Sequence, residues 1–127
     1  MNKLNKKMKE PFGWHLSLDF YDCDKEIIKD INNCYHFLSS VPDIIKTDIQ
    51  SPPFIVSKKN IGFAGWIPVV ESGISLYIDF STSFVAIDIY TCKKLDYDSL
   101  RKFSAELFKP QYIKENRFLR GNEYNNI

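Results

Sequence analysis

The sequence predicts an α+β fold, a two-layer sandwich in which two helices cover one face of an antiparallel sheet. Two observations lead to this prediction. The elements follow the order strand, helix, strands, helix, strand, and two neighbouring strands are joined by a turn short enough to pair them antiparallel. With 127 residues, 44% hydrophobic and 15% aromatic, the chain fits one domain with a real core.

The first half of the chain predicts one strand and one helix. Residues 14–20 alternate between apolar and polar side chains, which is typical of a half-buried strand. Asp24 is a suitable N-cap for a first helix of about four turns that ends near Pro42. Apolar residues at helical spacing mark its buried stripe, namely Ile27, Ile31, Cys34 and Leu38. Residues 43–60 are harder to interpret, and the pair Pro52–Pro53 allows a short strand on either side.

The second half predicts strands with one more helix. Residues 61–70 contain Gly65 and Pro68, which favour an irregular or edge strand. Residues 74–80 and 84–92 alternate and form a hairpin around residues 81–83. Asp96 or Asp98 caps the second helix, Pro110 stops it, and residues 112–119 form the last strand.

Charge and cysteine content exclude several classes of protein. A net charge of +1 argues against a nucleic-acid binder. The sequence also predicts no membrane span and no signal peptide, and hence a cytoplasmic protein. Three widely spaced cysteines make neither a disulfide framework nor a zinc site, so no metal is expected. We expect a basic tail over residues 1–11, the domain over 12–121 and a polar tail over 122–127.

The second face of the predicted sheet mixes polar and apolar side chains. Tyr77, Asp79, Tyr90 and Cys92 fall on this face by strand alternation. Such a face is often covered by another sheet, so the sequence predicts a homodimer with polar residues lining a site.

Four segments occur in an order and spacing typical of a known family, namely Gly13–Leu16 with Phe20–Asp24, Glu71–Ser75, Ala86–Cys92, and Phe108–Pro110 with Arg120–Gly121. Together they resemble the prokaryotic S-adenosylmethionine decarboxylases, which are pyruvoyl-dependent enzymes of polyamine biosynthesis. The likeness covers roughly residues 12–121.

The resemblance implies a chain that cleaves itself between Glu71 and Ser72. Ser72 would attack the carbonyl of Glu71 and become a pyruvoyl group, the only cofactor implied. That group would form a Schiff base with a small substrate of the amino-acid type. Cys92 would then be the proton donor after loss of carbon dioxide, since a thiol is a reasonable general acid.

Several positions depart from the family pattern. Gly73 stands where the family has a histidine, and Tyr77 replaces a second histidine that assists processing, which makes Tyr77 a possible helper. In the substrate-binding region, Asp79 replaces a tryptophan and Ser81 a glutamate, while Phe54 offers an alternative stacking surface.

Three hypotheses therefore remain open at this point. The substrate is S-adenosylmethionine, or it is arginine or ornithine, whose cationic ends Asp79 suits. Alternatively, the chain is an uncleaved, inactive relative that serves as a binding or regulatory partner.

Overall fold

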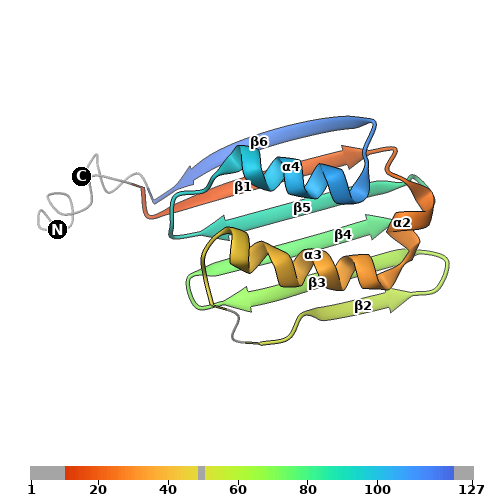
Figure 1. Cartoon of the computed structure of the whole chain (residues 1–127), viewed down its shortest axis with the longest axis horizontal. Coiled ribbons are helices and arrows are strands. Elements are labelled where there is room, and N and C mark those ends of the chain that lie inside the picture. The colour runs from red at the N-terminus through yellow and green to blue at the C-terminus, as the bar shows by residue number, and fades with distance from the viewer. Residues whose placement is uncertain (1–10, 49–50, 122–127) are drawn as a thin grey trace, which may run out of the picture.

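The predicted sandwich of helices on an antiparallel sheet is confirmed by a computed structural model, which describes residues 11–48 and 51–121 (Figure 1). The strands lie in the order β2-β3-β4-β5-β1-β6, and every paired neighbour is antiparallel. The strands are β1 (Gly13–Tyr21), β2 (Phe54–Lys58), β3 (Gly62–Val69), β4 (Ser72–Asp79), β5 (Phe84–Thr91) and β6 (Tyr112–Arg120). The helices are α2 (Lys25–Lys29), α3 (Ile31–Ile44) and α4 (Tyr97–Phe108).

The hydrophobic core lies between the sheet and the two long helices, α3 and α4, which run side by side over the same face (Figure 1). Alternation along the strands places one set of side chains in this layer. The core cysteines Cys23 and Cys34 belong to it, as does Phe37 of α3. The fully buried strand residues include Leu16, Leu18, Ile67, Ile74, Leu76, Val85, Ile87 and Ile89.

The first predicted helix is in fact two helices, α2 and α3. The described part of the chain therefore has three helices and not the two that the sequence predicted. Asp30 has an extended backbone (φ −91°, ψ 112°) and ends α2 while it caps α3. Its carboxylate accepts a hydrogen bond from the backbone N–H of Asn32 at 2.9 Å. An aspartate can therefore interrupt a helical pattern without disturbing the spacing of its apolar residues.

The two proline-based predictions have different outcomes. The helix α3 ends at Ile44, near Pro42 as predicted, and Val41 and Pro42 are buried against the core. The strand β3 is interior rather than an edge, since it pairs with both β2 and β4. Pairing with β2 ends at Trp66, so Pro68 lies where one side of β3 has no partner strand. A proline is tolerated there because no hydrogen bond is required of it on that side.

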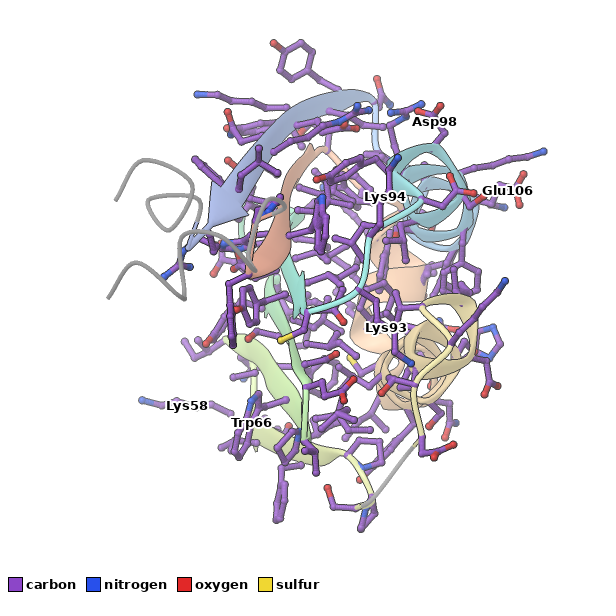
Figure 2. All side chains as sticks on the ribbon, turned by 90° about the vertical axis from the view of Figure 1, so that its left-hand side faces the viewer. Lys58, Trp66, Lys93, Lys94, Asp98 and Glu106 are labelled. Carbon is purple, nitrogen blue, oxygen red and sulfur yellow. The ribbon has the colours of Figure 1, made fainter. Side chains whose placement is uncertain are left out.

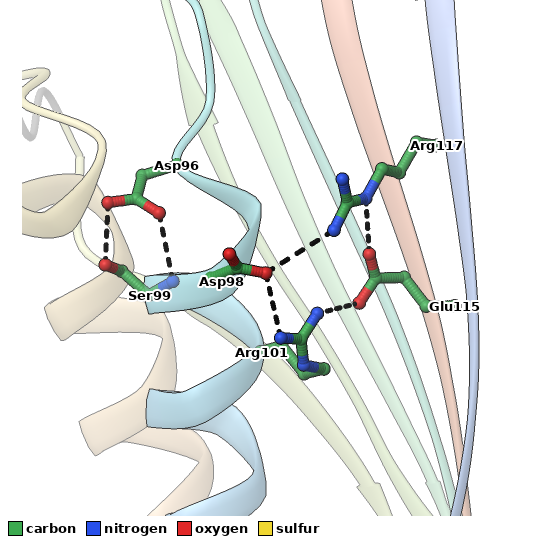
Figure 3. A network of polar contacts seen from close by, with 6 residues as sticks. All are labelled: Asp96, Asp98, Ser99, Arg101, Glu115 and Arg117. Atoms are coloured by element: carbon green, nitrogen blue, oxygen red, sulfur yellow. Dashed lines mark hydrogen bonds and ion pairs between the residues drawn. The ribbon is translucent and has the colours of Figure 1, made fainter.

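An ion-pair network fastens α4 to the edge strand β6 (Figure 3). Glu115 of β6 accepts hydrogen bonds from Arg101 of α4, at 2.7 Å, and from Arg117. Arg101 also reaches Asp98 at 2.8 Å. Burial alone would raise the pKa of Glu115, but the two arginines outweigh it and hold the pKa below its ordinary value.

Replacing Glu115 with glutamine is expected to destabilise the fold by about 1–2 kcal/mol at pH 7, because both arginines lose the less exposed of their two carboxylate partners. The native pKa of Glu115 is lowered, so its stabilisation is present above the unfolded pKa of about 4.3. It is lost as the pH falls through the native pKa. Urea titrations at several pH values should therefore show the gap between wild type and Glu115→Gln closing in acid. The control Asp98→Asn removes a carboxylate whose side chain is 78% exposed, and a change above about 0.5 kcal/mol there would contradict this account.

The opposite face of the sheet carries no helix in the ranges that the structure describes, and Lys58 and Trp66 project from it (Figure 2). Four aromatic side chains on this open face are between 47% and 56% exposed, namely Phe54, Trp66, Tyr77 and Phe118. An apolar surface of this kind is typical of an interaction site.

The predicted tails fall almost entirely outside the described residues, with Pro11 as the one exception, so their boundaries stay predictions. Within the described ranges, no helix has the length and apolar character needed to cross a bilayer.

Candidate active site

One end of the sheet brings Glu71 and Ser72 against Thr91 and Cys92. β4 begins at Ser72 where the antiparallel β5 ends at Thr91, and the two residues are direct partners in the ladder (Figure 1). Ser72 is only 8% exposed and Thr91 is fully buried. Ser72 and Thr91 are 19 positions apart in sequence. They lie in one cluster because the hairpin brings the end of β5 back beside the start of β4.

Two hydrogen bonds hold the peptide unit before Ser72. The hydroxyl of Ser72 donates to Oγ1 of Thr91 at 2.7 Å. The backbone N–H of Cys92 donates to the carbonyl oxygen of Glu71 at 3.1 Å. The serine hydroxyl and the carbonyl just before it are therefore both fixed from the end of β5.

A cavity of about 230 Å³ adjoins this peptide unit. Lys93 projects near the loop that follows α3 (Figure 2), where its Nζ donates to the carbonyl oxygen of Lys46 at 2.6 Å. The walls are mostly polar or charged, unlike the core behind them. The cavity is lined by Lys46, Thr47, Asp48, Val69, Val70, Glu71 and Lys93.

The three cysteines lie in different environments. Burial, reinforced by nearby Asp22 and Asp30 respectively, raises the pKa of both Cys23 and Cys34 to about 12. These thiols are thus neutral and enclosed, and Cys34 lies on the buried helix stripe that the sequence predicted. Cys92 is only partly buried and lies at the cluster itself. Its backbone N–H donates to the carbonyl oxygen of Glu71, and its thiol is the least buried of the three.

Tyr90 lies next to Cys92 on the open face of the sheet. Burial raises the pKa of Tyr90, with a further contribution from the adjacent Cys92, while Arg120 acts in the opposite direction. A Cβ added at Gly13 would lie 2.4 Å from the hydroxyl oxygen of Tyr90. A side chain at position 13 would therefore require the tyrosine ring to shift.

The structure does not bring Tyr77, Asp79 or Ser81 to Ser72 within one chain. Tyr77 is five residues along β4 and Asp79 seven, which at about 3.3 Å per residue gives roughly 16 and 23 Å. The carboxylate of Asp79 accepts hydrogen bonds from Thr82 and Ser81 at the β4–β5 turn, and these lower its pKa. Asp79 and Ser81 thus stabilise a turn, and their roles toward substrate stay predictions.

Phe54 and Gly73 differ in how they relate to the site. Phe54 lies on the edge strand β2, two strands away from β4, and its ring stacks on Trp66 with centroids 6.1 Å apart. Gly73 is adjacent to the site, and a Cβ added there would meet nothing within 4 Å.

Thr91 is the residue at this site that sequence reasoning missed. The alternation that places Val85, Ile87 and Ile89 in the core also turns Thr91 inward, so a signal was present. What it did not reveal is that Ser72 is the direct partner of Thr91 across the ladder. That fact depends on the strand register.

The fold and the site together define a small α+β protein with a buried serine, a threonine and a half-buried cysteine around one peptide bond. Among the described residues, no cluster of three or more histidine, cysteine, aspartate or glutamate side chains offers a metal site. The model of the S-adenosylmethionine decarboxylase family matches residues 14–121, and the chain belongs to that family. The family expected from the sequence, with its carboxy-lyase activity, is thus confirmed.

Individual relatives show the same likeness over most of the chain. The S-adenosylmethionine decarboxylase proenzyme of Pyrococcus furiosus is 26% identical over 115 residues, which cover 90% of this chain and 82% of the relative. The proenzyme of the same name from Clostridium botulinum strain Loch Maree is 28% identical, with 91% of each chain covered. The crystal structure of the adenosylmethionine decarboxylase from Aquifex aeolicus superposes with a TM-score of 0.77. It covers 88% of this chain and 92% of its own at 18% identity, so this match supports the fold.

Proposed function

We propose that this chain is a self-processing, pyruvoyl-dependent decarboxylase whose substrate is S-adenosylmethionine. The observation that carries the proposal is the peptide unit between Glu71 and Ser72. A buried serine follows a carbonyl that is already hydrogen-bonded, at the bond where the resemblance in sequence implies cleavage. The curated relatives are themselves named proenzymes, which denotes a precursor chain.

Self-processing needs only groups of this chain and one water. The Oγ of Ser72 forms a bond to the carbonyl carbon of Glu71, the C–N bond breaks, and the hydroxyl proton ends on the freed nitrogen of Ser72. The resulting ester loses the α-proton of residue 72 and releases the carboxylate of Glu71, which leaves an enamine. Protonation of its Cβ gives an imine, and hydrolysis of that imine by one water expels ammonia and leaves a ketone at the new N-terminus. The products are residues 1–71 and a pyruvoyl-blocked chain from position 72.

The residues around position 72 fit a pyruvoyl group. The group would begin β4, directly after Glu71, whose carbonyl accepts from the backbone of the half-buried Cys92 and which also lines the cavity of about 230 Å³. Such a group supplies a ketone that condenses with the amine of the substrate and draws electrons from the bond to its carboxylate. Cys92 then delivers a proton to the carbon that has lost carbon dioxide.

A homodimer accounts for the open face of the sheet. Its half-exposed aromatic residues would be covered if two sheets packed face to face, as in other β-sandwich interfaces. Tyr77 lies on this face and is roughly 16 Å from Ser72 in its own chain. If Tyr77 assists processing, it must therefore do so from a second copy of the chain. The same holds for substrate contacts of Asp79.

Covalent trapping tests the proposed substrate. Purified protein is incubated with S-adenosylmethionine, arginine or ornithine, reduced with borohydride, and analysed by mass spectrometry. We expect an added mass on the fragment that begins at position 72, after S-adenosylmethionine only. The variant Ser72→Ala is the control and should take up nothing. If only arginine or ornithine became attached, the substrate would be a basic amino acid and not S-adenosylmethionine. If only the full-length chain were found, the protein would be an uncleaved, inactive relative.

A further inference from the structure

The hydroxyl of Thr91 contacts Ser72 at the cleavage site, but it has no role in the self-processing steps described above. Thr91 is fully buried and has the β-branched side chain that restricts rotation about its first torsion. Two donors meet its Oγ1, the hydroxyl of Ser72 at 2.7 Å and the backbone N–H of Lys93 at 3.2 Å. A hydroxyl oxygen has two acceptor positions, and both are filled here.

This arrangement restrains the orientation of the Ser72 hydroxyl. Oγ1 of Thr91 accepts a hydrogen bond from that hydroxyl and a second one from the N–H of Lys93. The lone pairs of Ser72 Oγ are then not engaged by Thr91 and stay available for attack. An accepted hydrogen bond also increases the electron density on the donor oxygen, which favours nucleophilic attack.

The carbonyl that would be attacked is held from the next residue along the chain. The N–H of Cys92 donates to the oxygen of Glu71 at 3.1 Å, and this oxygen gains negative charge when the tetrahedral adduct forms. Three consecutive residues therefore act on this peptide unit. Thr91 contacts the nucleophile, the hydroxyl of Ser72, and the N–H of Cys92 contacts the electrophile, the carbonyl of Glu71. The N–H of Lys93 orients the hydroxyl of Thr91.

We propose that Thr91 is a positioning residue for self-processing, an inference that rests on the proposed function. It holds the Ser72 hydroxyl in the orientation for attack on the Glu71 carbonyl, while the backbone amide of Cys92 stabilises the developing oxyanion. Thr91 itself neither gains nor loses a proton overall. The hydroxyl proton of Ser72 still ends on the Ser72 nitrogen when the C–N bond breaks.

The test compares cleavage rates of Thr91→Val and Thr91→Ser with wild type, measured by intact mass over time from freshly made precursor. Valine keeps the shape of threonine but cannot accept a hydrogen bond, so cleavage should slow by about 10- to 100-fold. Serine keeps the acceptor and should restore most of the rate. The matched control is Ser104→Ala, which removes another buried hydroxyl, bonded to the carbonyl of Leu100 at 2.7 Å, on α4. This control should cleave like wild type, and thermal melting confirms that each variant is folded.

Hydroxylamine separates the steps, because it cleaves an ester but not an amide. If Thr91 acts in ester formation, Thr91→Val should be slow both with and without hydroxylamine. Rapid cleavage of this variant only when hydroxylamine is present would place Thr91 after the ester and overturn the inference. Wild-type rates in Thr91→Val would overturn the inference while the proposed function stands. A wild-type chain that never cleaves would overturn both.

Discussion

Replacing Ser72 with alanine is expected to leave the chain in one piece, with no decarboxylation of S-adenosylmethionine. Without Oγ there is no nucleophile for the Glu71 carbonyl, and no pyruvoyl group can form from alanine. The variant should fold, because Thr91 keeps its hydrogen bond from the Lys93 amide and the lost bond costs about 1 kcal/mol. Denaturing gels and intact mass are the measurements, and thermal melting confirms folding.

The matched control for this variant is Ser104→Ala, in which a buried hydroxyl is removed far from the cleavage site. It should give the same two fragments as wild type. If Ser72→Ala were cleaved at the same bond, another group would have to be the nucleophile, and the chemistry assigned to Ser72 would be wrong.

The second large effect is expected at Cys92. Cys92→Ala should still cleave itself, because its contact with the Glu71 carbonyl is made by the backbone N–H, which alanine retains. Its decarboxylation rate should nevertheless fall by about 10²- to 10⁴-fold, the range typical of losing a positioned general acid. Release of labelled carbon dioxide from carboxyl-labelled substrate measures the rate, and a denaturing gel of the same sample measures cleavage.

Cys34→Ala is the control for this loss of activity. Cys34 is fully buried in the core, so its replacement opens a small cavity and lowers stability by about 1 kcal/mol without touching the site. Activity should stay close to wild type. A Cys92→Ala variant that cleaves and decarboxylates at full rate would remove Cys92 from the mechanism.

Most of the fold could be predicted from the sequence because strand alternation and helix spacing are local signals. The pairing of β4 with β5 followed from the short turn between them, and it places Ser72 beside the end of β5. The break at Asp30 was not visible, since one aspartate can end a helix and begin another without changing the apolar spacing. The strand β3 is interior because β2 pairs with its outer side. β2 could not be predicted with its partner, because residues 43–60 show only a weak alternation of apolar and polar side chains.

Of the residues predicted for the candidate site, the structure brings together only those that are neighbours across the β4–β5 ladder. Glu71, Ser72 and Cys92 meet because the register aligns the two strand ends. Tyr77 and Asp79 lie on the same strand as Ser72, yet the rise of about 3.3 Å per residue carries them away from it. A family motif indicates which residues an activity needs, but it does not show whether these residues lie close together within one chain.

The most direct test of self-processing is the intact mass of the purified wild-type chain after long incubation. We expect two species, residues 1–71 with a free carboxylate at Glu71 and residues 72–127 with a pyruvoyl group in place of the N-terminal serine. A single mass corresponding to all 127 residues, in protein that melts cooperatively, would contradict it.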